Sequence, residues 1–135
     1  DSKAAVALLG NTFDTKQGII LEGSLMLPKA KDSPRCGVYL ECTNDLGVGV
    51  LIDSTGVAEL GPMKADGTGF KAEKRVDREM EFGSPAAFRL LVRGSLMEFY
   101  LDDILIESFA LPDNASGRIG LINAVDIMGT LKAWN

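Results

Sequence analysis

The chain has 135 residues, of which 14 are basic and 19 acidic, so its net charge is −5. This is the length of one domain, and it is enough for a single core without disulfide or metal staples. No basic patch stands out, and the longest apolar runs are far too short to cross a bilayer, so neither nucleic acid nor a membrane is an expected partner. The sequence contains no histidine, which excludes Ser-His-Asp and Cys-His nucleophiles and histidine metal sites.

Short runs rich in apolar and β-branched residues recur along the chain, separated by Gly, Pro, Asn and Asp, and no stretch has the pattern of an ordinary helix. The expected strands cover residues 4–9, 19–27, 37–43, 48–52, 57–60, 70–74, 88–93, 96–101, 104–110, 118–123 and 127–134. The charge-rich stretch 71–82 is the weakest, and a helical turn, a solvated edge strand and a loop all remain open there. We therefore predict an all-β fold, a two-sheet antiparallel jelly-roll sandwich in which residues 1–135 form a single domain.

Two cysteines, Cys36 and Cys42, lie in the expected strand 37–43 or next to it. Six residues of extended chain span roughly 20 Å, whereas a disulfide requires Cα atoms within about 7 Å. We therefore expect both cysteines to be unpaired and buried, and to pack as small hydrophobic residues. They say little about the redox compartment.

The stretch from Ala87 to Leu111 is the most regular part of the sequence, with tight turns at Gly94-Ser95 and Asp102-Asp103. Because side chains alternate across a strand, a two-residue turn at Gly94-Ser95 divides this hairpin into two faces. The core face carries Phe88, Leu90, Val92, Met97, Phe99 and Leu101, and the other face carries Arg89, Leu91, Arg93, Leu96, Glu98 and Tyr100.

Earlier strands add polar side chains to this second face if they belong to the same sheet. Tyr39 and Glu41 alternate with apolar residues in strand 37–43, and Glu22 does so in strand 19–27. The resulting candidate site comprises Arg89, Arg93, Glu98 and Tyr100, with Tyr39 and Glu41 beside them. Guanidinium and carboxylate groups with phenol rings suit a ligand rich in hydroxyls. The alternative is a wet surface of cross-strand ion pairs, each contributing about 0–1 kcal/mol.

The segment RLLVRGSLMEFYLDD resembles a strand pair in the C-terminal sandwich of invertases and levanases. Arg89, Val92, Ser95 and Glu98 match the usual pattern, whereas Tyr100 replaces a Phe and Arg93 stands where an Asp is common. Four further features are similar to the related levan-binding module and to laminin-G-like domains. They are the acidic turn at Asp102-Asp103, the strand Gly117–Leu121, the final strand ending in an aromatic residue and the opening ILEGSLMLP.

This resemblance implies a concanavalin A-like sandwich attached to a sugar-active enzyme. It also implies that the Arg and Glu of the hairpin help to build a sugar pocket in the binding modules, whereas in the enzyme-attached versions the domain often only packs on the catalytic domain. Trp134 is the only tryptophan, so the chain offers no row of exposed rings for crystalline polysaccharide. A short or terminal glycan is the expected ligand.

Catalysis and metal binding are the less favoured interpretations of the acidic residues. Retaining glycosidases place two carboxylates about 5–5.5 Å apart, whereas Glu98 and Asp102 are four residues apart on one strand, about 13 Å. A pair between Glu98 and either Glu41 or Glu22 across strands remains open. Four residues in turns carry oxygen atoms that could bind calcium, namely Asp53, Asp113, Asn114 and Asp126. Turn propensity explains each of them, so no cofactor is predicted.

The sequence therefore predicts a non-catalytic carbohydrate-binding or accessory domain, excised from a longer, secreted glycoside hydrolase and located outside the cell or in the periplasm. Its partners would be a carbohydrate and a catalytic domain of the same parent chain. The alternative is a laminin-G-like structural or protein-interaction domain without affinity for sugar, and a small glycosidase is the third and least favoured hypothesis.

Overall fold

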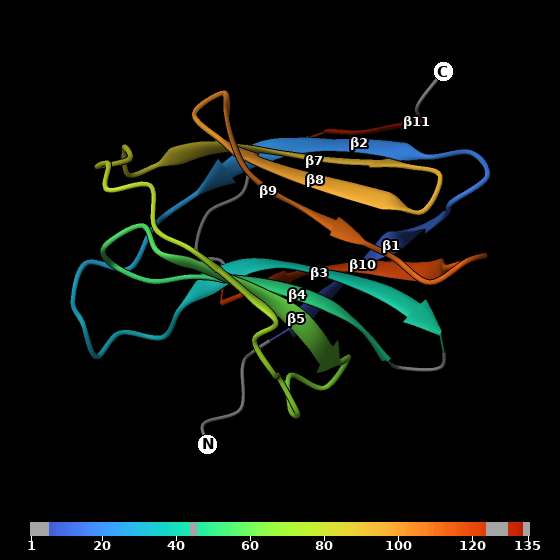
Figure 1. The fold of residues 1–135 in the computed structure, drawn as a ribbon, viewed down its shortest axis with the longest axis horizontal. Coiled ribbons are helices and arrows are strands. Elements are labelled where there is room, and N and C mark those ends of the chain that lie inside the picture. Colours follow the sequence, from blue (N-terminus) through green and yellow to red (C-terminus); the bar gives the residue numbers. More distant parts are fainter. Residues whose placement is uncertain (1–5, 44–45, 124–129, 134–135) are drawn as a thin grey trace.

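Two antiparallel sheets packed face to face make up the molecule in a computed structural model that describes residues 6–43, 46–123 and 130–133 (Figure 1). The described residues form strands, turns and loops and include no helix, so none of them makes a helix that could span a membrane. The predicted all-β, two-sheet antiparallel sandwich is confirmed.

We call the six-stranded sheet, with the order β1-β10-β3-β4-β5-β6, sheet A and the five-stranded sheet, with the order β11-β2-β7-β8-β9, sheet B. Each expected strand has a counterpart in the structure. The strands are β1 (Val6–Asp14), β2 (Ile19–Leu25), β3 (Cys36–Thr43), β4 (Leu46–Ile52), β5 (Ala58–Lys64), β6 (Lys74–Val76), β7 (Ala86–Arg93), β8 (Leu96–Leu101), β9 (Ile104–Ala110), β10 (Ser116–Ile122) and β11 (Thr130–Ala133).

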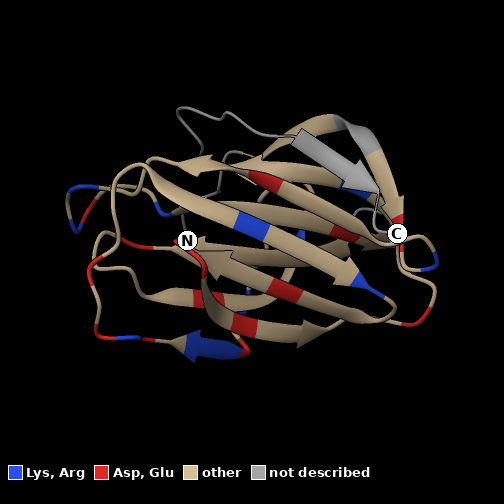
Figure 2. Cartoon of the chain, turned by 90° about the horizontal axis from the view of Figure 1, so that it is seen from above, with Lys and Arg blue, Asp and Glu red and all other residues tan. Residues whose placement is uncertain are grey.

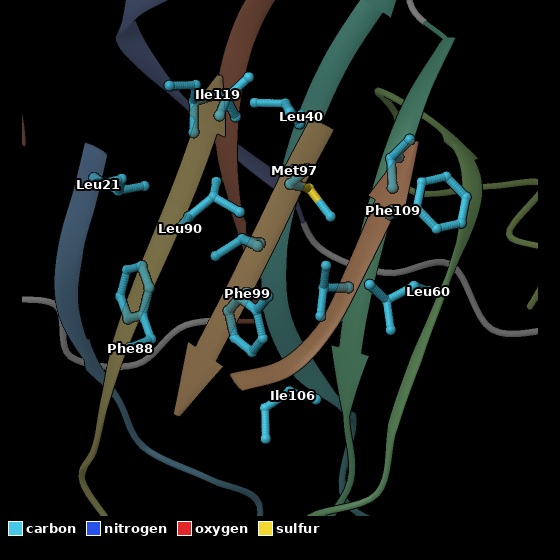
Figure 3. Packing of buried hydrophobic residues seen from close by; sticks show 14 of the residues in the cluster. Leu21, Leu40, Leu60, Phe88, Leu90, Met97, Phe99, Ile106, Phe109 and Ile119 are labelled. Carbon is cyan, nitrogen blue, oxygen red and sulfur yellow. The ribbon is translucent and has the colours of Figure 1, made fainter. Parts of the chain in front are cut away.

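The core lies between the sheets (Figure 3). It is built from the side chains that point inward, which alternate along the strands with side chains that point outward. Phe88 and Phe99 of sheet B stack with ring centroids 6.4 Å apart. Side chains of sheet A, among them Leu40 and Leu60, belong to the same cluster. Burial of each such side chain stabilises the fold by about 1.5–3 kcal/mol. Both cysteines are buried and unpaired, as predicted.

The hairpin β7–β8 has the predicted register, with Arg89 opposite Tyr100 and Leu91 opposite Glu98. Gly94, Asp102 and Asp103 have positive φ values of 58°, 48° and 65°, which is the conformation that such tight turns require. The face assignment of this hairpin is therefore correct: its apolar set is buried in the core, and Arg89 lies on the outer side.

The expected strand 70–74, which overlaps the charge-rich stretch 71–82, is only partly right. Strand β6 is short and begins at Lys74, and most of the following charged residues are exposed. Arg78 leaves this segment to donate hydrogen bonds to the carbonyls of Leu105 and Ile106 in β9, both at 2.8 Å. Lys74 Nζ donates to the Ser108 carbonyl at 2.8 Å. The charged stretch therefore covers the free edge of β9. The final expected strand overlaps β11, but Trp134 lies outside the described residues.

Candidate functional site

Four of the six candidate residues lie together on the outer face of sheet B. Arg89 and Arg93 are on β7, and Glu98 and Tyr100 are on β8. Glu22 of β2 is directly opposite Arg89. Figure 2, which looks onto this sheet, shows the basic positions of β7 between acidic positions on the two neighbouring strands. The predicted gathering of these charges is therefore correct for sheet B.

Three of these side chains, Arg89, Glu98 and Tyr100, contact one another or the adjacent turn. The Arg89 guanidinium lies 4.7 Å from the centre of the Tyr100 ring, and its Nη2 is 3.6 Å from Oδ1 of the exposed Asp103. Tyr100 donates a hydrogen bond of 3.3 Å to Glu98. Desolvation and then the Glu98 charge raise the pKa of Tyr100, and Arg89 opposes them. The hollow bounded by Leu91, Arg93, Leu96 and Glu98 is small, about 250 Å³.

Tyr39 and Glu41 do not join this group, because β3 belongs to sheet A. The alternation correctly placed both residues on an outer face, but it was the outer face of the other sheet. Tyr39 is completely buried there and packs in a second apolar cluster with Leu51 and Met63. Gly49 lies opposite Tyr39, and a Cβ at Gly49 would stand 3.2 Å from the Met63 side chain, so the glycine leaves room for this packing.

Glu41 has a structural partner on the neighbouring strand. Its Oε2 accepts from Nη2 of Arg118 at 2.7 Å, and its Oε1 accepts from Nε at 2.9 Å and from the Arg118 backbone N–H at 3.2 Å. Only 7% of Glu41 is exposed. Because Glu41 and Glu98 lie on the outer faces of opposite sheets, they cannot flank one bond, which removes this carboxylate pair from the glycosidase hypothesis.

A larger hollow lies over the outer face of sheet A, at the end where the β2–β3 connection arrives from sheet B. Its volume is about 540 Å³, within the range of ligand pockets. Leu51 and Met63 belong to its lining and to the apolar cluster around Tyr39. The polar and aromatic side chains that line it include Lys31, Asp32, Ser33, Arg35, Asp53, Phe70 and Asn123. We call this hollow the Arg35 pocket.

Three contacts hold Arg35 in place, two on its guanidinium and one on its backbone carbonyl. Its Nη1 forms an ion pair with Glu59, and its guanidinium lies 5.5 Å from the centre of the Phe70 ring. Asn123 donates a hydrogen bond from Nδ2 to the Arg35 carbonyl at 2.7 Å. The guanidinium remains partly exposed, with 37% of the side chain accessible. A fixed cation with spare N–H groups therefore faces the pocket.

Asp53 supplies a fixed acceptor to the same pocket. Its Oδ1 accepts hydrogen bonds from the backbone N–H and hydroxyl of Thr55, at 2.8 and 2.6 Å, and from the Val57 N–H at 3.1 Å. Partial burial raises the pKa of Asp53, but these hydrogen bonds and the charge of Arg35 outweigh it, so the pKa lies below its ordinary value. Within the described residues, Oδ2 has no hydrogen-bond partner. Asp53 is thus an ionised acceptor with one oxygen left for a ligand.

The chemistry of the Arg35 pocket matches a neutral molecule with several hydroxyl groups. A hydroxyl donates to a carboxylate and accepts from a guanidinium, so neighbouring hydroxyls engage Asp53 and Arg35 together. Sequence reasoning missed Arg35, Phe70 and Asn123, and it considered Asp53 only as a calcium donor. These residues come from four separate segments, and only the turn signal at Asp53 marked any of them. Asp126, another of the calcium donors considered, lies outside the described residues.

No family model matches the sequence, and no curated protein matches it. Solved structures share the fold at low identity. The carbohydrate-binding module CBM66 from Bacillus subtilis has a TM-score of 0.70 at 11% identity, over 100% of this chain and 81% of that one. A galectin from Caenorhabditis elegans has a TM-score of 0.66 at 14% identity, over 100% and 93%. Galectin-Ib from Xenopus laevis has a TM-score of 0.58 at 16% identity, over 94% and 99%.

Proposed function

We propose that this domain binds a neutral carbohydrate without catalysis, and that the ligand occupies the Arg35 pocket. The observation that carries the proposal is the combination of a fixed cation, a fixed carboxylate and a partly exposed phenyl ring around one hollow of about 540 Å³. The fold shared with a carbohydrate-binding module and with galectins supports a sugar as the ligand class.

The pocket lies away from the face that the sequence favoured, so the two locations make different predictions. On sheet B, Arg89 covers Tyr100 and Tyr100 donates to Glu98, although the buried Nε of Arg89 has no hydrogen-bond partner among the described residues. On sheet A the cation and carboxylate face a hollow large enough for a sugar ring. The outer face of sheet B, with Arg89, Arg93, Glu98 and Tyr100, is the second candidate location.

A glycan array followed by titration calorimetry tests the function and the location together. The change Asp53→Asn keeps an oxygen for the Thr55 turn but removes the charge, and hydrogen bonds to charged groups are worth about 1.5–3 kcal/mol. We expect roughly a 10- to 100-fold loss of affinity in this variant and no loss in Arg89→Ala or Glu98→Gln. The reverse pattern would place the ligand on sheet B.

Failure of the folded domain to bind any fructan, glucan, xylan or galactan would contradict the proposal and favour the laminin-G-like alternative, a structural or protein-interaction domain. Release of reducing sugar from any of these polymers would contradict the non-catalytic assignment. A carboxylate variant that abolished the release would then identify the catalytic group.

We also propose that the domain serves as an accessory module of a secreted glycoside hydrolase, as its resemblance to the C-terminal sandwich of invertases and levanases implies. The full-length gene product, isolated from culture medium or periplasm, tests this. We expect to find a catalytic domain in the same chain. The change Asp53→Asn should lower its activity on polymer and leave its activity on small substrates unchanged.

A further inference from the structure

A second hollow adjoins the Arg35 pocket on the other side of the 33–35 segment. Its volume is about 410 Å³, and it shares Ser33, Pro34 and Asn123 with the Arg35 pocket. The shared wall is anchored by the 2.7 Å hydrogen bond from Asn123 to the Arg35 carbonyl. The two hollows therefore adjoin each other along this shared wall, which we call the Ser33–Pro34 partition.

The two hollows differ in chemistry. The second one is lined largely by apolar side chains, among them Met26, Leu27, Pro28 and Pro34. Leu27 is buried, whereas Met26 and Pro28 are partly exposed and available for contact. It lacks the carboxylate–guanidinium pair of the Arg35 pocket, and none of its lining residues is aromatic. A flexible thioether and proline rings suit an apolar group of irregular shape, not a sugar ring that needs paired polar contacts.

We propose that the two hollows together accommodate a glycoside: the sugar ring binds in the Arg35 pocket, and an apolar aglycone crosses the Ser33–Pro34 partition to lie against Met26 and Pro28. This inference rests on the proposed carbohydrate-binding function and names the ligand class more closely. It commits the second hollow to an apolar substituent and not to a second sugar unit.

Calorimetry with matched methyl and phenyl glycosides of glucose, galactose, xylose, arabinose and fructose tests the inference on the intact domain. For the sugar that binds, the phenyl glycoside should bind about tenfold more tightly than the methyl glycoside, because the phenyl ring leaves water for an apolar surface. The change Met26→Ser should reduce this ratio to near one and leave the affinity for the methyl glycoside unchanged. Leu96→Ser, which alters an exposed leucine of sheet B, is the matched control and should keep the ratio.

Equal affinity for the methyl and phenyl glycosides in the parent protein would overturn the inference and leave the proposed function intact. A preference for the phenyl glycoside that persists in a folded Met26→Ser variant would also overturn the inference. The same holds if an unsubstituted disaccharide gains as much affinity over the methyl glycoside as the phenyl glycoside does. Binding of none of the ten probes would instead overturn the proposed function together with this inference. If Met26→Ser does not fold, the ratio of phenyl to methyl affinity is compared between the parent protein and Pro28→Ser, which should lower it in the same way.

Discussion

The ion pair between Glu41 and Arg118 gives a quantitative test of the outer face of sheet A. The change Arg118→Met removes the hydrogen bonds from Nε and Nη2, at 2.9 and 2.7 Å, and leaves the carboxylate of Glu41, a residue that is only 7% exposed in the parent structure, without this cation. Loss of one partner from a buried ion pair costs about 3–5 kcal/mol. The Arg118 side chain is itself 42% exposed, so water compensates part of the loss. We expect the free energy of unfolding to fall by about 2–3 kcal/mol.

Urea denaturation followed by circular dichroism measures this change, and thermal unfolding should show a Tm lower by roughly 10 °C for a domain of this size. Arg93→Met is the matched control, because Arg93 is exposed on sheet B, and exposed positions usually change stability by less than about 0.5 kcal/mol. The double change Glu41→Leu with Arg118→Met removes both charges and should recover most of the loss.

Equal stability of the Arg118→Met and Arg93→Met variants would refute this reasoning. It would mean that the Glu41 carboxylate is well solvated without Arg118, and Glu41 would become available as a ligand contact again. A double variant less stable than Arg118→Met alone would also refute it, because removal of a costly unpaired carboxylate has to recover stability.

Three further outcomes follow from the same contacts. Because Asp53 has a lowered pKa, sugar affinity measured by calorimetry should stay constant from about pH 7 to about pH 5 and be lost only as the pH falls through a value below the ordinary Asp pKa of about 3.9; a loss centred near pH 5 would contradict this. Burial raises the pKa of Cys36 and Cys42 to about 11, so both thiols should resist iodoacetamide at pH 8 in the folded domain and react after unfolding; rapid labelling of the folded domain would contradict their burial. Arg78→Ala exposes two carbonyls at the edge of β9 and should cost about 1–2 kcal/mol and promote self-association in sedimentation, whereas a monomer of unchanged stability would show that the edge needs no cover.

The sequence determined the strands and their faces because alternation and turn chemistry are local signals. The hairpin from Ala86 to Leu101 shows this: the turn at Gly94-Ser95 set the register, and the register set which side chains face the core. Sheet membership is not local. Nothing in the strand Cys36–Thr43 tells whether it pairs with β2 or with β10. Tyr39 and Glu41 joined the candidate site only on the condition that their strand shares a sheet with the hairpin, and this condition is not met.

The Arg35 pocket escaped sequence analysis for the same reason. Its side chains lie in the β2–β3 connection, after β4, in the segment before β6 and at the end of β10, and only the packing of sheet A brings them together. Phe70 was assigned to a strand, where its ring would be one of many apolar positions. The structure instead places it beneath Arg35, which gives it a partner that no spacing rule predicts.

The outer faces of the two sheets are built differently, and this difference decides where a ligand fits. On sheet B, a ligand that engages Arg89 has to displace its contacts with Tyr100 and Asp103. On sheet A, the hydrogen bonds of Asp53 all fall on Oδ1 and fix the carboxylate, and within the described residues Oδ2 has no hydrogen-bond partner. Preorganised groups bind with less loss of side-chain freedom. The pocket over sheet A is therefore the stronger location for the ligand, even though the charges on sheet B are more conspicuous in the sequence.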